Sequence, residues 1–167
     1  VVQREDPSVD DYELVDLPNG AVVKAQYEVN SIANTLTNLA LDDVKPVTDI
    51  SFHGRQPLSV ELTTFDGLRI SMQTIKEGKR NFARFQAVFD ASLATHGATG
   101  VSESTAAEQK NRLKTPDDAK KEAAKLAARW KDWVYAVPQY RIDSLAKKKS
   151  ELFKVGEQDK SEKTSGG

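Results

Sequence analysis

The chain of 167 residues contains no cysteine, which excludes disulfide bonds, thiolate nucleophiles and cysteine-ligated zinc. It also lacks any run of about 18 consecutive apolar residues, the length that a membrane-spanning helix requires. No signal peptide, with a basic start and an apolar stretch, is present either. The sequence begins at Val1 without a Met, so we expect a processed product or a piece of a longer chain.

Histidine is almost as scarce, and the two that occur lie in no metal-ligand spacing. His53 and His96 stand in polar, glycine-bearing segments, and no G-x-S-x-G elbow marks a nucleophilic serine. The glycines form neither a P-loop nor a G-x-G-x-x-G turn. We therefore expect a protein that is not an enzyme and holds no metal or cofactor. A hydrolase with its site in the loop 91–114 stays as a weaker alternative.

Composition indicates one ordinary domain. With 38% apolar residues the chain can bury a core, and its formal net charge of −1 argues against a nucleic-acid partner. We expect a disordered segment over residues 1–10, a domain over 11–153 and a disordered tail over 154–167. Within the domain, residues 91–115 lack any sustained periodicity and predict a flexible loop.

The strongest local pattern predicts a meander of strands. In "PLSVELTTFDGLRISMQTI", apolar and polar residues alternate on both sides of Asp66-Gly67, which predicts a hairpin with a type I′ turn. A third strand over 81–90 should place Phe82 and Arg84 on one face and Phe85 on the other. Pro46 makes the segment 41–47 an edge strand, since proline cannot donate to a ladder.

Helices are expected at three places. Apolar spacing of three and four residues predicts one from about Lys24 to Ala40. Thr115-Pro116 is a well-formed helix start. Pro138 separates a short strand from a last helix, which should run from Tyr140 to about residue 153. The predicted fold is α+β: an antiparallel sheet of meander hairpins with two to three helices packed on one face.

A basic and aromatic stretch is the best candidate for a binding site. Lys79, Arg80, Phe82 and Arg84 interleave charge with an aromatic ring, as in strands that stack single-stranded bases. Phe82 and Phe85 should point to opposite faces, however, so they cannot form one stacking platform. Single-stranded nucleic-acid binding through residues 76–89 is kept as the alternative function.

The segment "WVYAVPQYRIDSLAKKKSELF" carries the remaining large aromatics. Trp133 and Tyr135 share strand parity, and aromatics beside a hairpin most simply fill a core. Lys147, Lys148 and Lys149 should project from the outer side of the last helix.

The order of these elements resembles the family of domain of unknown function 4340. The matching stretches, "VNSIANTLTNLALDDVKPV", "PLSVELTTFDGLRISM", "NFARFQA" and "WVYAVPQYRIDSLAKKKSELF", span Tyr12 to Phe153. The signature residues are Trp133, Tyr135, Pro138 and Tyr140, and we expect them to be structural. The segment 90–132 departs from the family pattern as a long insertion.

The resemblance implies a location and a role. It implies a bacterial, non-enzymatic accessory or binding module that is extracytoplasmic (periplasmic), with an N-terminal anchor contacting the membrane. Such a module is sometimes linked to ABC-type transport or gliding motility, so we expect a protein partner in a membrane-associated complex. The isolated chain should be a monomer, and a cytoplasmic location is the alternative.

Overall fold

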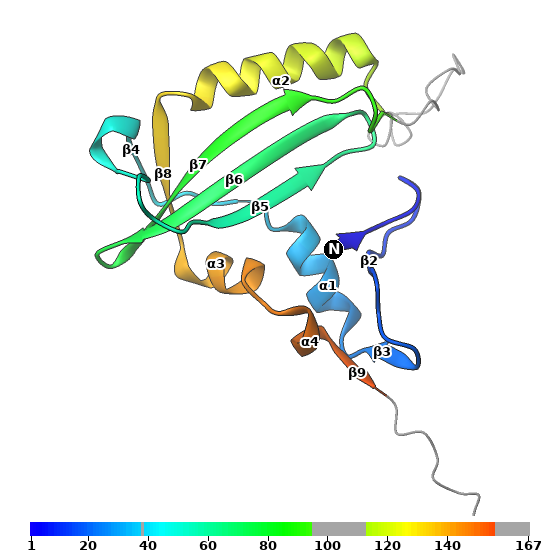
Figure 1. Ribbon diagram of the computed structural model, residues 1–167. Coiled ribbons are helices and arrows are strands. Elements are labelled where there is room, and N and C mark those ends of the chain that lie inside the picture. The colour runs from blue at the N-terminus through cyan, green and yellow to red at the C-terminus, as the bar shows by residue number, and fades with distance from the viewer. Residues whose placement is uncertain (38, 95–112, 156–167) are drawn as a thin grey trace, which may run out of the picture.

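The computed structural model describes residues 1–37, 39–94 and 113–155 and has the predicted α+β fold (Figure 1). Its centre is a five-stranded antiparallel sheet in the order β4-β8-β7-β6-β5. The sheet strands are β4 (Asp43–Pro46), β5 (Leu58–Thr63), β6 (Leu68–Glu77), β7 (Arg80–Phe89) and β8 (Trp133–Val137).

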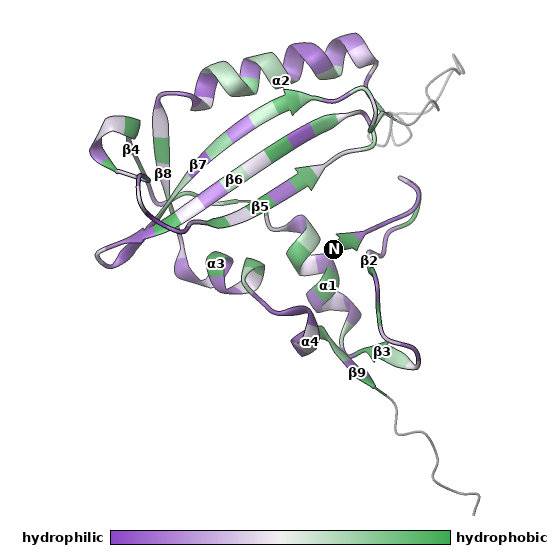
Figure 2. Ribbon diagram, in the orientation of Figure 1, coloured by the Kyte–Doolittle hydropathy of each residue, from purple (hydrophilic) through white to green (hydrophobic). Residues whose placement is uncertain are grey.

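The meander β5-β6-β7 follows the sequence pattern closely, and apolar and polar bands alternate along its strands (Figure 2). Leu62 pairs with Ile70 across the first hairpin, and Met72 pairs with Phe85 across the second. The predicted type I′ turn is wrong, because that turn needs two residues with positive φ and only Gly67 has one, at +87°. Instead, the Thr64 N–H donates to the Leu68 carbonyl at 2.9 Å, closing a longer loop.

Helices cover one face of this sheet, which we call the helical face. Helix α2 (Pro116–Trp130) begins as predicted, with the Thr115 hydroxyl accepting from the Asp118 N–H at 3.2 Å. Its buried Ala123 packs with Leu68 and Ala87 of the sheet. Toward the other end of the same face, α3 (Gln139–Leu145) packs Ile142 and Leu145 in a cluster with Met72, Ala83 and Val137. These contacts confirm the prediction that helices lie on one face.

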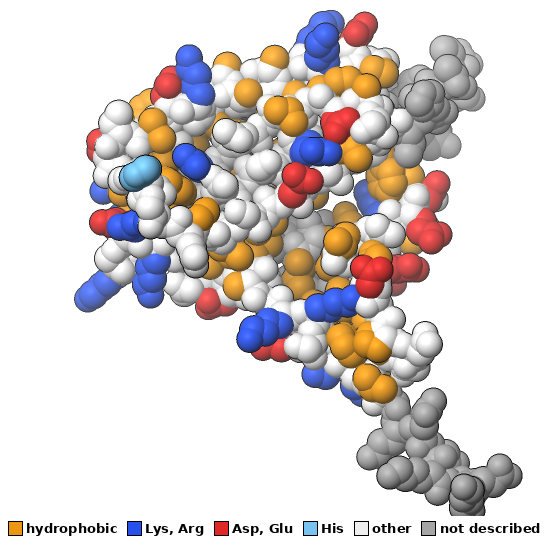
Figure 3. All heavy atoms as spheres, in the orientation of Figure 1, with side chains coloured by type: hydrophobic (Ala, Val, Ile, Leu, Met, Phe, Trp, Pro, Cys, Tyr) orange, Lys and Arg blue, Asp and Glu red, His pale blue; other side chains and the backbone are white. Residues whose placement is uncertain are grey.

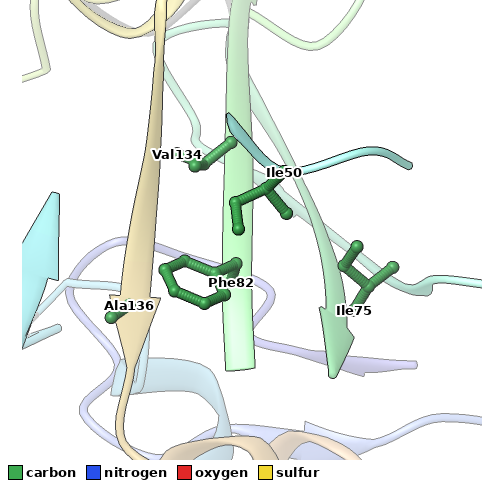
Figure 4. Packing of buried hydrophobic residues seen from close by; sticks show 5 residues of the cluster. All are labelled: Ile50, Ile75, Phe82, Val134 and Ala136. Carbon is green, nitrogen blue, oxygen red and sulfur yellow. The ribbon is translucent and has the colours of Figure 1, made fainter. Parts of the chain in front are cut away.

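The opposite face, which we call the open face, is covered at one end only. There the 3₁₀ helix η1 (Val47–Asp49) and the segment after it lay Ile50 over Phe82 and Val134 (Figure 4). Phe82 is 3% exposed. Beyond this cluster the strands present mainly polar side chains such as Gln73 and Gln86, as expected for an antiparallel sheet with one solvated face.

A smaller group of elements lies beside the sheet (Figure 1). Helix α1 (Gln26–Asn34) buries Val29 completely, and β3 (Ala21–Val23) pairs with β9 (Phe153–Val155). Residues 1–10, expected to be disordered, instead include β1 (Val2–Gln3), which pairs with β2 (Glu13–Leu14).

The last predicted helix, starting near Tyr140, is divided. Helix α3 ends at Leu145, and a separate short helix, α4 (Lys149–Leu152), begins after Lys148, whose backbone is extended. The expected tail starting at Lys154 is strand β9 as far as Val155, and the rest of it lies outside the described residues.

Candidate functional site

The described residues contain no group of three or more acidic or histidine side chains placed to hold a metal ion. Nor does any helix in the described ranges have the length and apolar character needed to cross a bilayer. His53 is exposed, and its main-chain N–H donates to the Ser51 hydroxyl at 3.3 Å. His96 and most of the loop 91–114 lie outside the described residues, so the hydrolase alternative stays a prediction.

The four residues predicted to bind nucleic acid do not form one surface. Phe82 is buried beneath Ile50, with the Lys45 ammonium 5.4 Å from its ring centroid. Lys79 is exposed in the turn between β6 and β7. Arg80 pairs with Asp43 at 3.0 Å.

Arg84 lies on the open face, away from that turn. Its Nε donates to Gln73 at 2.8 Å, and its guanidinium stacks on Phe52 at 4.6 Å. The only ring of the predicted set is therefore used by the core. The strand parity predicted for Phe82 and Phe85 is what the structure has, since Phe85 packs on the helical face.

Two of the four signature residues are exposed, and the other two are half-buried. Trp133 is 42% exposed and Tyr140 60% exposed, so the expectation that Trp133 fills the core is wrong. Tyr135 is half-buried 5.7 Å from the Phe85 ring, and burial raises the pKa of its hydroxyl. Pro138 lies at the start of α3 as its N-cap. It is Trp130, the last residue of α2, that packs against the sheet, with its ring 5.4 Å from that of Phe85.

The two edges of the sheet differ, and the outward side of β4 offers no free main-chain N–H. The Val47 N–H donates to the Asp132 carbonyl at 2.9 Å. Hydrogen-bonded pairs alternate along an antiparallel ladder, so the main-chain groups of Val44 and Pro46 point away from β8. The Asp43 carboxylate accepts from the outward Val44 N–H at 2.9 Å, and Pro46 has no N–H to offer.

The β5 edge has no such protection. The hydrogen bond from Thr64 to Leu68 sets the phase of the ladder, which directs the main-chain groups of Ser59, Glu61 and Thr63 away from β6. No described residue makes a hydrogen bond to these outward groups. We call these three residues, with their outward N–H and carbonyl groups, the β5 edge.

An apolar hollow lies beside the β5 edge. Leu58 and Val60 are half-buried on the helical face, where Leu36 and Leu39 from the segment after α1 pack against the same cluster, which includes Met72. The surface is hollowed between the sheet and the N-terminal elements, with hydrophobic side chains along its walls (Figure 3). A chain lying along β5 would therefore meet apolar surface on its helical side.

Charges gather on the open side of β5. Arg69 donates to Asp90 at 2.8 Å, while its Nε lies 3.8 Å from the Glu61 carboxylate, too far for a hydrogen bond. Glu61 is 54% exposed in its side chain. The Ser92 hydroxyl and then the Ser92 N–H hold the pKa of Asp90 below its usual 3.8, so Asp90 is an ionised partner for Arg69 near neutral pH.

Sequence reasoning identified β5 as a strand but not as the unpaired edge. The alternation of Leu58, Val60 and Leu62 predicts one buried face, yet it contains no information about which neighbours a strand has. The available clue was Asp43, which with Pro46 marks the other edge as protected.

Comparison with known proteins found no family model, no curated protein and no solved structure that matches this chain, so its resemblance to the family of domain of unknown function 4340 stays a prediction.

Proposed function

We propose that the protein is a non-catalytic accessory module that binds an extended segment of a partner protein as an additional strand along β5. The observation that carries the proposal is the β5 edge, where the outward main-chain groups of Ser59, Glu61 and Thr63 have no partner among the described residues. Strand addition of this kind gains its affinity from main-chain hydrogen bonds and its specificity from alternate side chains.

The contrast between the two edges supports this function. Open edges are sites of unwanted association, and proteins usually protect them. Asp43 and Pro46 do so on β4, whereas β5 offers three outward N–H groups beside an apolar hollow. An edge left available next to apolar surface fits a strand that is completed by a partner.

The resemblance adds an expected setting. It supports an extracytoplasmic module in a membrane-associated assembly, with a protein rather than a nucleic acid as partner. The burial of Phe82 weighs against the alternative of base stacking. The sequence encoded upstream of Val1 tests the setting, because an anchored module requires a segment of about 20 apolar residues or a signal peptide there.

Selection of peptides from a random display library on the 167-residue protein tests strand addition without assuming a ligand. Selected peptides should bind the Ser59→Pro variant at least about fivefold more weakly, because proline removes one outward donor and crowds the added strand. The β5–β6 ladder should survive, since the Ser59 N–H does not point at β6.

Val44→Pro is the matched control on the other edge. The Val44 N–H also points outward, but Asp43 already accepts it, so this variant should bind the selected peptides like the wild type. Equal binding to all three proteins, or peptides that lose affinity only with Val44→Pro, would contradict the proposed function.

A further inference from the structure

Resting on the proposed function, we infer that the partner segment alternates apolar and polar residues and carries a lysine or arginine directly opposite Glu61. This assigns the β5 edge a ligand class: an extended, basic-centred peptide segment.

The main-chain groups fix how a partner would align. An added antiparallel strand would form hydrogen-bonded pairs with Ser59, Glu61 and Thr63, whose N–H and carbonyl groups point outward. Side chains opposite one another in a sheet lie on the same face, so residues paired with these three lie on the open face. Their neighbours in the partner, opposite Val60 and Leu62, lie on the helical face.

The helical side favours apolar residues. Val60 and Leu58 belong to the cluster that contains Leu36, Leu39 and the fully buried Met72. A partner side chain opposite Val60 would extend this cluster and remove apolar surface from water. A charged residue at that position would lose hydration without gaining an ionic partner.

The open side favours a positive charge opposite Glu61. Glu61 is the only charged side chain on β5, and its contact to Arg69 is a long one of 3.8 Å. Arg69 makes its closer bond to Asp90, at 2.8 Å, which leaves the Glu61 carboxylate without a hydrogen-bonded partner. A lysine or arginine directly across the ladder lies within reach of that carboxylate.

The same charge discriminates against wrong partners. An acidic strand would place like charges opposite each other, which is destabilising. A second copy of β5 paired antiparallel about Glu61 would do the same, with two glutamates facing. Glu61 therefore keeps the edge open for a basic segment while opposing acidic segments and this form of self-pairing.

A defined peptide tests the inference. Thr-Val-Thr-Val-Lys-Val-Thr-Val-Thr has the required alternation, and calorimetric titration into the protein gives its Kd. Replacing the lysine by glutamine should weaken binding about two- to fivefold, the range of a cross-strand ion pair, and replacing it by glutamate should weaken it further. With the Glu61→Lys variant the order should reverse, so that the glutamate peptide binds best.

Two controls separate this inference from the function on which it rests. Exchanging the lysine with a neighbouring valine keeps the composition but turns the charge to the helical side, and this peptide should bind worst. If peptides bind, lose affinity with Ser59→Pro and yet ignore the charge at Glu61, strand addition stands and the inference is overturned. If none of the peptides binds, both the inference and the proposed function lose their support.

Discussion

Replacing Gly67 by alanine should destabilise the fold far more than the same change at Gly78, although both glycines lie in hairpin turns with positive φ. Gly67 has φ +87°, and a Cβ built there would lie 2.8 Å from the Asp90 carbonyl oxygen and 2.8 Å from a carbon of the Phe89 ring. Gly78 has φ +60°, and a Cβ there would meet nothing within 4 Å.

The expected magnitudes follow from these contacts. A left-handed conformation costs an alanine about 1–2 kcal/mol at either site. At Gly67 the Phe89 ring can turn away, but the Asp90 carbonyl belongs to the backbone. Moving it strains the 2.8 Å hydrogen bond from the Asp90 N–H to the Gly67 carbonyl, whose loss costs about 1 kcal/mol more. With the overlap itself, Gly67→Ala should lose roughly 3–4 kcal/mol of unfolding free energy and Gly78→Ala roughly 1 kcal/mol.

Urea unfolding followed by tryptophan fluorescence measures both variants. Trp130, the last residue of α2, packs against Phe85 of the sheet, so its emission reports the loss of packing on the helical face. The comparison needs equal denaturant slopes, which show that both variants unfold from equally compact states. Losses that differ by less than about 1 kcal/mol would refute the assigned loop geometry.

Three further outcomes are expected. Phe82→Ala should lower the unfolding free energy by about 3–5 kcal/mol in denaturant, whereas Lys79→Ala should change it by less than about 0.5 kcal/mol; a stable Phe82→Ala protein would contradict the core assignment. Thr115→Ala should cost about 1 kcal/mol by removing the cap of α2, measured by thermal unfolding, and an unchanged midpoint would argue against the cap. The pKa of Asp90 is lower in the folded than in the unfolded protein, so its stabilising contribution is present above the unfolded pKa and is lost as the pH falls through the folded pKa. Carboxyl NMR should show Asp90 titrating below 3.8, and the Ser92→Ala substitution should raise that pKa. An unchanged pKa in the variant would contradict the role of Ser92.

Local chemistry made much of the sheet predictable. Leu58, Val60 and Leu62 alternate with polar residues because one face of the strand is buried, and the structure has β5 where that pattern predicts it. Thr115 and Pro116 predict the start of α2 for equally local reasons, a side-chain acceptor and a missing N–H.

The wrong predictions concern residues whose structure is determined by contacts with parts of the chain distant in sequence. Trp133 has the parity of a core residue, but it pairs with Pro46 of the short edge strand β4, at the margin of the sheet, and its side chain is left exposed. The residues from Tyr140 to Leu152 do have helical spacing. However, the Lys24 N–H donates to the Leu152 carbonyl at 2.9 Å, and this part of the chain forms α4 and then β9 in place of one continuous helix. No local pattern encodes either fact.

The candidate site could not be predicted from the sequence for a related reason. A strand's pattern records which face is buried but not whether its outer edge has a neighbour. The charge at Glu61 is visible in the sequence, but its availability depends on Arg69 turning toward Asp90. Only the folded sheet shows that β5 is the edge with unpaired main-chain N–H groups.

The pairing of β3 with β9 has a consequence for the order in which the molecule folds. The β6–β7 hairpin joins residues close in sequence, so it can close quickly. β3 and β9 meet only across most of the chain, as the contact between Lys24 and Glu151, 127 positions apart, illustrates. Closing so long a loop carries a larger entropy loss. We therefore expect this small ribbon to form last and to open first, with its amides exchanging hydrogen well before those of β6 and β7.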